Sequence, residues 1–301
     1  MEIIKVHPQG FCKGVINAIK MTNESLNEAP KPIYMLGSIV HNSNITNTYS
    51  SLGIITVKSL DEITPNKGSI IITAHGVSNY KLSKIMELNL KIIDTTCESV
   101  KQIQDIVRDK INSGFAVIYY GVKNHAECLG IEEDYIENSN FYLIQNLEDL
   151  EKSDIKNEKV FFTNQTTMSY FKTIEIIEKV KEKYPHAIIK EDICYATKSR
   201  QLAFIESSKK TDFSIVVGDK NSNNTISLAN ICKTYADKPC ALIENLDDLR
   251  NIDFSSYSSI SITSGASTPQ VIVNEVINKI NDSNYQSNIK ELDYIKIKAG
   301  N

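Results

Sequence analysis

The amino-acid sequence predicts an α/β protein made of three pseudo-threefold-related α/β units, each with a small parallel sheet, around one central cavity. Two observations predict this class. Short apolar runs alternate with segments of helical periodicity along most of the chain, which is typical of parallel sheets flanked by helices. Four sequence features also recur three times in the same order, which indicates an internal repeat.

The first recurring feature is a cysteine between a strand-like segment and a helical pattern. Cys12, Cys97 and Cys194 hold this position, at intervals of 85 and 97 residues. Three further features recur at similar intervals, namely an apolar run ending in glycine, an acidic turn that begins with leucine, and an apolar run ending in threonine. They stand at Gly37, Gly121 and Gly218, at residues 60–62, 147–149 and 246–248, and at Thr73, Thr163 and Thr263. Each feature alone is weak, but together they favour three copies of one unit.

Each unit is expected to run from its cysteine through a helix, a strand, a helix, a strand, the acidic turn, a strand, a helix and a strand to the next cysteine. Helical periodicity is clearest after Cys97, where Val100, Ile103 and Ile111 share one face. It is equally clear in the segment Ser169–Tyr184. The sequence therefore predicts about four strands in each unit.

The third unit lacks its last strand, because no strand-cysteine segment follows the helical pattern near residues 271–280. The N-terminus carries a spare one at Glu2–Cys12, so we expect residues 1–13 to complete the third unit. The expected units are residues 14–97, residues 98–194, and residues 195–283 together with 1–13. The tail, residues 284–301, has no counterpart in the repeat.

Composition excludes several classes of protein. The chain is 41% hydrophobic and 23% charged, which suffices for a substantial core. Its formal net charge of −4 argues against nucleic-acid binding, which needs a basic surface. No apolar run approaches the roughly 18 residues of a membrane span, and no leader pattern precedes Cys12. We therefore expect a cytoplasmic protein without membrane contact.

In a reducing compartment the cysteines are more often free, metal-bound or catalytic than disulfide-bonded. Taken singly, each would be a buried free thiol. We keep that interpretation for Cys128, Cys232 and Cys240. It does not explain why Cys12, Cys97 and Cys194 share one repeat position. A 4Fe–4S cluster normally takes four thiolates, so three thiolates predict a cluster with one iron left open, whereas structural zinc would need a fourth ligand.

The loops that follow the strands should form a ligand site, because such loops meet at one edge of a parallel sheet. His41, His125 and Ser222 each stand four residues after a loop glycine. A single loop histidine is usually a solvated surface residue, but here two of five histidines share a repeat position. The threonine loops add His75, hydroxyls and amides. Such groups, with N–H groups at helix N-termini, are the donors that a diphosphate needs.

Glu127 is the one carboxylate near the histidine position of a glycine loop. Two interpretations are open. It can be an acid at a helix N-terminus, where the helix dipole favours negative charge. It can also be a proton donor whose pKa is raised in a closed site.

At these loops the sequence resembles the 4-hydroxy-3-methylbut-2-enyl diphosphate reductase (LytB) family of the non-mevalonate isoprenoid pathway, over residues 1–285. The matching stretches are residues 10–15, 40–42, 74–77, 96–97, 125–127, 165–167, 193–197, 220–222 with Asn224, and 265–269. The resemblance implies a trefoil around one 4Fe–4S cluster per chain, held by the three repeat cysteines. It implies a diphosphate pocket made by His41, His75, His125, Ser222, Asn223, Asn224 and Ser267.

The resemblance also implies a reaction. Thr166 and Glu127 would lie at the hydroxymethyl end of the substrate, with Glu127 feeding protons. The implied activity is a reductive dehydroxylation that takes two electrons and two protons, releases water, and yields isopentenyl and dimethylallyl diphosphate. The electrons would arrive singly from a ferredoxin or a flavodoxin.

The chain departs from the family pattern at three places. Glu98 stands where proline is common, residues 128–130 replace a Val-Glu-Gly pattern, and Asn223 stands where serine is usual. Two other functions remain open from the residues alone. A 4Fe–4S hydro-lyase would need a base and no external electrons. A non-catalytic iron–sulfur sensor or binding module is the other, although the polar, histidine-rich cavity with one acid argues against it.

Overall fold

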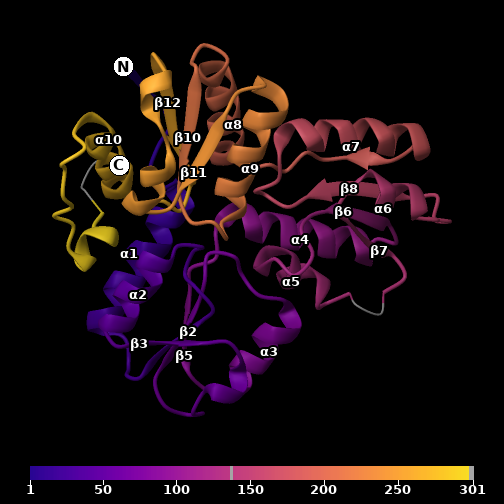
Figure 1. Cartoon of the computed structure of the whole chain (residues 1–301). Helices are drawn as coiled ribbons and strands as arrows, with labels where there is room; N and C mark the ends of the chain where they lie inside the picture. Colours follow the sequence, from indigo (N-terminus) through magenta and orange to yellow (C-terminus); the bar gives the residue numbers. More distant parts are fainter. Residues whose placement is uncertain (136–137, 298–301) are drawn as a thin grey trace.

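The computed structural model describes residues 1–135 and 138–297. It contains three four-stranded sheets, and every strand pairing in them is parallel. The α/β class with three small parallel sheets is therefore confirmed. Figure 1 shows the three units as lobes, with the first at the bottom, the second at the right and the third at the top.

The three sheets have the same topology, with the first strand of the unit second in order and flanked by the second and third strands. The first sheet has the order β3-β2-β4-β5, with β2 (Ile33–Leu36), β3 (Ile54–Val57), β4 (Ser69–Ile72) and β5 (Lys91–Asp94). The second has the order β7-β6-β8-β9, with β6 (Ala116–Tyr120), β7 (Phe141–Ile144), β8 (Val160–Asn164) and β9 (Ile188–Ile189). The third has the order β11-β10-β12-β1, with β10 (Phe213–Val217), β11 (Cys240–Ile243), β12 (Ser259–Ser264) and β1 (Glu2–Lys5).

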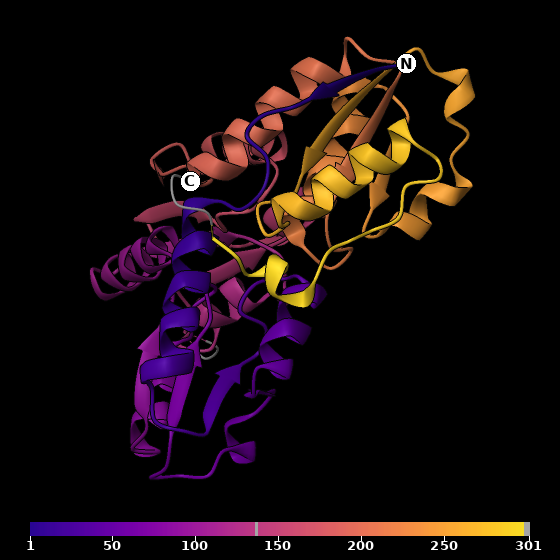
Figure 2. The same cartoon turned by 90° about the vertical axis from the view of Figure 1, so that its left-hand side faces the viewer.

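The N-terminal strand β1 belongs to the third sheet. It runs parallel to β12, with Lys5 opposite Ile262, and the Val6 N–H donates to the Ile262 carbonyl at 2.9 Å. Figure 2 shows this first strand lying along the strands of the last unit before the chain descends into the first. The chain therefore supplies the fourth strand of its last sheet from its first residues. The division into units at the expected boundaries stays a prediction.

The helices also fall into equivalent sets. Those that follow the three cysteines are α1 (Lys13–Glu28), α4 (Glu98–Asn112) and α8 (Tyr195–Ser208). Those that follow the glycine loops are α2 (Ser43–Ser51), α5 (Ala126–Glu132) and α9 (Asn223–Ile231). Those that follow the threonine loops are α3 (Asn79–Glu87), α7 (Tyr170–Lys183) and α10 (Gln270–Asn281).

The expected acidic turns are short helices instead of simple turns. They are η1 (Leu60–Glu62), α6 (Leu147–Lys152) and η3 (Leu246–Asn251), and the remaining short elements are η2 (Cys232–Ala236), η4 (Phe254–Ser256) and η5 (Glu291–Tyr294). The cause is local, because the side chains of Ser59, Asn146 and Asn245 each accept a hydrogen bond from a backbone N–H of the first turn. Such caps stabilise a helical turn that acidic residues alone would not specify.

Each sheet is buried on both faces, which explains why its strands are continuously apolar. In β2, Ile33 and Met35 pack with α1 and α2, whereas Tyr34 faces the opposite side with Ile85 of α3. This follows from the alternation of side chains along a strand. The same pattern places α4 and α5 opposite α7, and α8 and α9 opposite α10.

The C-terminal segment returns from the third unit to the first. The Asn23 side-chain amide donates to the Ile295 carbonyl at 3.1 Å, and the Thr48 hydroxyl donates to the Glu291 carbonyl at 3.1 Å. Ile295 is buried in the core formed by α1 and α2. Figure 1 shows this segment, in yellow, beside those two helices. Within residues 1–135 and 138–297, no helix is long and apolar enough to cross a membrane.

Candidate active site

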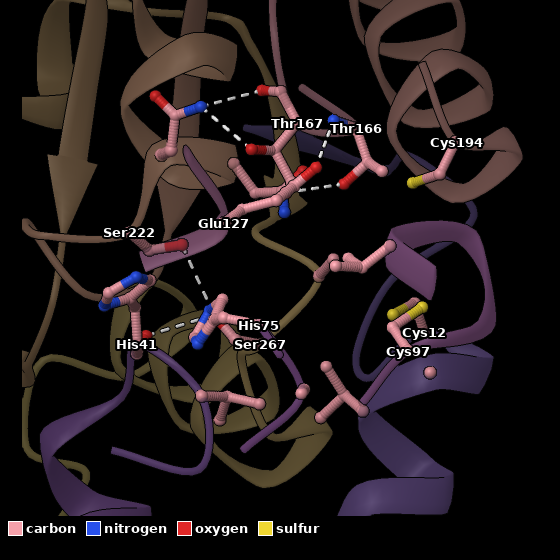
Figure 3. A pocket seen from close by; sticks show the side chains of 18 of the residues that line it. Cys12, His41, His75, Cys97, Glu127, Thr166, Thr167, Cys194, Ser222 and Ser267 are labelled. Atoms are coloured by element: carbon pink, nitrogen blue, oxygen red, sulfur yellow. Dashed lines mark hydrogen bonds between the residues drawn. The ribbon is translucent and has the colours of Figure 1, made fainter. Parts of the chain in front are cut away.

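The loops of all three units meet at one pocket. Figure 3 shows the thiols on one side, two histidines on the other, and Glu127 with Thr166 between them. The lining residues are Cys12, Gly14, Val15, Val40, His41, Ala74, His75, Cys97, Val100, His125, Glu127, Thr166, Thr167, Cys194, Ser222, Asn223, Asn224, Ala266 and Ser267. Every residue named as a candidate from the sequence is among them.

The three repeat cysteines are held by equivalent backbone contacts. Each is the N-cap of its helix, with extended backbone geometry. Each also donates its N–H at 3.0 Å to a carbonyl of a threonine loop. The pairs are Cys12 with Ala266, Cys97 with Ala74, and Cys194 with Thr166. The repeat therefore fixes where each cysteine backbone lies relative to the pocket.

The thiols themselves remain available for ligation. None of the three side chains caps its helix, and all three cysteines are free. Burial raises the pKa of the Cys97 thiol, and burial raises that of Cys194 to about 11. Gly14 keeps the space beside the thiols of Cys97 and Cys12 open, because a Cβ at this position would lie 2.7 Å from the Cys97 Sγ and 3.9 Å from the Cys12 Sγ.

Three histidines cluster at the opposite end of the pocket. The ring centroids of His41 and His75 are 4.4 Å apart, those of His41 and His125 are 5.1 Å apart, and those of His75 and His125 are 5.7 Å apart. Burial lowers the pKa of each imidazole, to about 4 for His125 and well below the usual range for His75, where the two neighbouring histidines lower it further. At neutral pH the cluster is therefore uncharged.

Hydroxyl groups surround this histidine cluster. Ser222 Oγ and Ser267 Oγ are 3.3 Å apart, and the Ser267 hydroxyl donates to the His41 carbonyl at 3.1 Å. The Nε2 atom of His41 is buried and has no hydrogen-bond partner among the described residues. Since buried polar groups are normally paired, this nitrogen is suited to a ligand that brings its own polar atoms.

Glu127 lies at the first turn of α5 and is 1% exposed. Thr166 holds its carboxyl group with two contacts, from the backbone N–H to Oε1 at 2.7 Å and from the hydroxyl to Oε2 at 2.9 Å. Burial raises the pKa of Glu127 to about 7, although both contacts from Thr166 lower it. This environment favours the interpretation of Glu127 as a proton donor. An acid that serves only to interact with the helix dipole would have a lowered pKa.

The two asparagines at the start of α9 make different contacts. The Asn223 amide donates to Thr167, at 3.0 Å to its carbonyl and 2.9 Å to its hydroxyl. The Asn224 Oδ1 accepts from the Thr197 hydroxyl at 2.8 Å, and that hydroxyl lies 3.2 Å from the Cys194 Sγ. Asn223 thus connects the third unit with the second. Asn224 is connected with the Cys194 thiol through the Thr197 hydroxyl.

Three contributors to the site were not predicted as such. Gly14 and Thr167 line the pocket, and Thr197 connects Cys194 with Asn224. Thr167 follows directly after the candidate Thr166, and Gly14 lies two residues after Cys12, so both could have been found by extending the same loops. Thr197 falls within the matching stretch 193–197, but its contact with the Cys194 thiol depends on the first turn of α8 and is not visible in the sequence.

Three parallel-sheet units whose loops line one thiol-bearing pocket define an α/β enzyme in which every unit contributes to the same site. The chain belongs to the LytB protein family, whose model matches residues 3–281.

One relative in sequence and two solved structures are each described as a diphosphate reductase. A 4-hydroxy-3-methylbut-2-enyl diphosphate reductase from Anoxybacillus flavithermus is 40% identical over 286 residues, which cover 92% of this chain and 89% of the relative. The structure of the E-1-hydroxy-2-methyl-but-2-enyl-4-diphosphate reductase from Plasmodium falciparum superposes with a TM-score of 0.87 at 29% identity, covering 94% of this chain and 89% of that one. A second structure, of (E)-4-hydroxy-3-methyl-but-2-enyl diphosphate reductase, has a TM-score of 0.66 at 30% identity, covering 94% of this chain and all of the other.

Proposed function

We propose that this protein reduces 4-hydroxy-3-methylbut-2-enyl diphosphate to isopentenyl and dimethylallyl diphosphate, the terminal step of the non-mevalonate pathway. The overall reaction consumes the allylic alcohol, two electrons and two protons, and releases the product and one water. The observation that carries the proposal is a buried acid, Glu127, held between a thiol side and a histidine side of one pocket. Membership of the LytB family supports the same activity.

The cofactor of the proposal is one 4Fe–4S cluster per chain, held by Cys12, Cys97 and Cys194. The donor set fits this group, since all three thiols are free and uncapped and Gly14 leaves the space beside two of them open. No three His, Cys, Asp or Glu side chains of residues 1–135 and 138–297 are grouped tightly enough to hold a single metal ion. A cluster takes its thiolates on different irons, and when bound it supplies single electrons and one iron open to substrate.

The diphosphate of the substrate would bind at the histidine side. His41, His75 and His125 offer ring nitrogens there, and the hydroxyls of Ser222 and Ser267 offer donors. The His41 Nε2, which has no hydrogen-bond partner within residues 1–135 and 138–297, supports this assignment. Asn224 adds a side-chain amide, and Asn223 remains a proposed contact although its amide donates to Thr167 in this structure.

Glu127 would hold the proton that the reaction consumes. A carboxyl group with a pKa of about 7 is protonated in a large part of the molecules at neutral pH. The two contacts from Thr166 fix the orientation of both carboxyl oxygens.

The electrons would come one at a time from a small redox protein, a ferredoxin or a flavodoxin, in the cytoplasm. Six free cysteines in the chain are in keeping with a reducing compartment. A net charge of −4 gives no support to a nucleic-acid partner.

An anaerobic assay with the hydroxylated diphosphate and reduced methyl viologen tests the proposal, comparing the wild type with Glu127→Gln. We expect the variant to lose about 10²-fold or more of kcat, as removal of a general acid does. Glu132→Gln, on the same helix but outside the pocket, is the matched control and should keep its rate. Equal rates for wild type and Glu127→Gln would refute the proton-donor role, and turnover without any reductant would indicate a hydro-lyase.

A further inference from the structure

We infer that Arg200 is a positioning residue for the proposed cluster: its buried positive charge compensates the thiolates and makes the cluster easier to reduce. The inference rests on the proposed function, because it needs the cluster to be present. It concerns a residue outside the pocket lining and outside the set of candidate ligands. The argument comes from where this side chain lies and what surrounds it.

Arg200 lies on α8, six residues after Cys194, and is 3% exposed. Its Nη2 donates to the Gly10 carbonyl at 2.8 Å, and its Nη1 approaches the Pro8 carbonyl at 3.4 Å. Arg200 therefore connects the helix that follows one cysteine with the loop that leads into Cys12. Gly10 has a φ of +73°, so that loop has a backbone shape that favours glycine.

The guanidinium group is a buried cation with no carboxylate partner. Among residues 1–135 and 138–297, no Asp or Glu forms an ion pair with it. Its Nε atom is buried and lacks a hydrogen-bond partner in the same part of the chain. Carbonyl groups alone compensate a buried charge poorly. The thiols of Cys12 and Cys194 act electrostatically on this guanidinium, since both raise the pKa of Arg200 against the larger effect of burial.

The threefold repeat shows that the fold itself does not require a cation here. The residues six positions after Cys12 and Cys97 are Ala18 and Ile103, and both are buried and apolar. Two of the three equivalent helices thus use an apolar side chain where α8 uses Arg200. A buried charge that breaks the repeat at one position, where the helix after Cys194 contacts the loop before Cys12, points to a function at these thiols.

The change in charge when the cluster is reduced gives the direction of the effect on its reduction potential. One-electron reduction, from dithionite or a donor protein, adds one negative charge to the cluster. A fixed positive charge in a buried environment stabilises the more negative state. Arg200 therefore raises the reduction potential of the cluster and helps to hold three thiolates close together.

The test compares Arg200→Lys with Arg200→Gln, two variants that both lose the forked guanidinium and differ in charge. Each full-length chain is reconstituted anaerobically, its iron and sulfide are measured, and the cluster potential is determined by redox titration followed by electron paramagnetic resonance. We expect the Gln variant to have a more negative potential than the Lys variant, or to hold less iron. Arg250→Gln removes an equally positive but exposed side chain and should leave the potential unchanged.

Three results would overturn the inference. The first is the same potential in the Lys and Gln variants. The second is an equal loss of iron from both, which would assign Arg200 to anchoring Gly10 alone. The third is a Gln variant whose cluster-free chain no longer folds by circular dichroism while the Lys variant folds, because the charge would then serve the fold. A wild-type chain that binds no iron would instead refute the proposed function.

Discussion

At the scale of single residues, burial decides the chemistry of the site. Glu127 and the three histidines are ordinary titratable groups whose surroundings move their pKa values in opposite directions. Burial raises the pKa of the Glu127 carboxyl to about 7 and lowers the pKa of His125 to about 4. At neutral pH Glu127 can therefore give a proton, and the histidine cluster is uncharged until an anion binds.

A pH profile follows from the Glu127 pKa. In the free protein the carboxyl loses its proton as the pH rises through about 7, so kcat/KM should fall above that pH. Glu127→Gln cannot lose a proton at this position, so its kcat/KM should fall less steeply above that pH than that of the wild type, at a lower overall rate. Initial rates between pH 6 and pH 9 measure it. The same falling limb in the Gln variant would assign it to another group.

Diphosphate binding should take up protons. The histidines are neutral in the free protein because burial depresses their pKa values, and a bound anion raises those values again. Protonation and binding therefore favour each other, so affinity should rise as the pH falls from 8 to 6. Titration calorimetry with inorganic diphosphate, in two buffers of different ionisation enthalpy, measures the uptake. His125→Asn should take up fewer protons, and an unchanged uptake would exclude His125.

Gly14→Ala should remove the proposed cluster without unfolding the protein. The new Cβ would lie 2.7 Å from the Cys97 Sγ, in the space that the cluster would occupy. Gly130→Ala is the control, since its Cβ would meet the flexible end of Gln104 at 2.8 Å. Iron and sulfide analysis should show loss in the first variant only. A Gly14→Ala protein with full iron content would place the cluster elsewhere.

Site residues could be predicted from the sequence where they share a repeat position or fall in a stretch that resembles the family. His41, His125 and Ser222 are visible because they share one position after a loop glycine. Arg200 is not visible, since its repeat partners Ala18 and Ile103 are apolar and an arginine in a helix normally points to solvent. Likewise, no pattern shows that the amide of Asn223 donates to Thr167.

At the scale of elements, the four-strand unit could be predicted because parallel strands buried on both faces are continuously apolar. The acidic turns could not be assigned as helices, since their helical form depends on single capping side chains such as Ser59 and Asn146. The last strand of the second unit is only two residues long, whereas its counterparts β5 and β1 have four residues each.

The placement of β1 in the third sheet predicts its protection. The N–H groups that pair with β12, including that of Val6, should exchange with deuterium as slowly as those of β12 itself. Mass spectrometry of peptides covering residues 2–6 and 259–264 measures this. Fast exchange in the first peptide alone would contradict the pairing.

At the scale of the whole molecule, the units are held together by chain segments that cross between them. The C-terminal segment buries Ile295 in the first unit, a contact that the repeat could not predict because the tail has no counterpart in it. Ile295→Ala should lower the free energy of unfolding by about 2–4 kcal/mol, as for other buried Ile truncations. Leu292→Ala, at a side chain that is 57% exposed, should change it little. Denaturant unfolding of both variants measures the difference.

The position of the first strand also orders events during synthesis. Gln9, in the loop before Cys12, donates to the carbonyl of Ile262, which lies 253 residues further along the chain. A ribosome releases the N-terminal residues first, and domains generally fold as they emerge. The loop that carries Cys12 nevertheless has no sheet to join until β12 has left the exit tunnel. The proposed cluster can therefore gain its full set of positioned thiolates only after β12 has been synthesised and has left the ribosome.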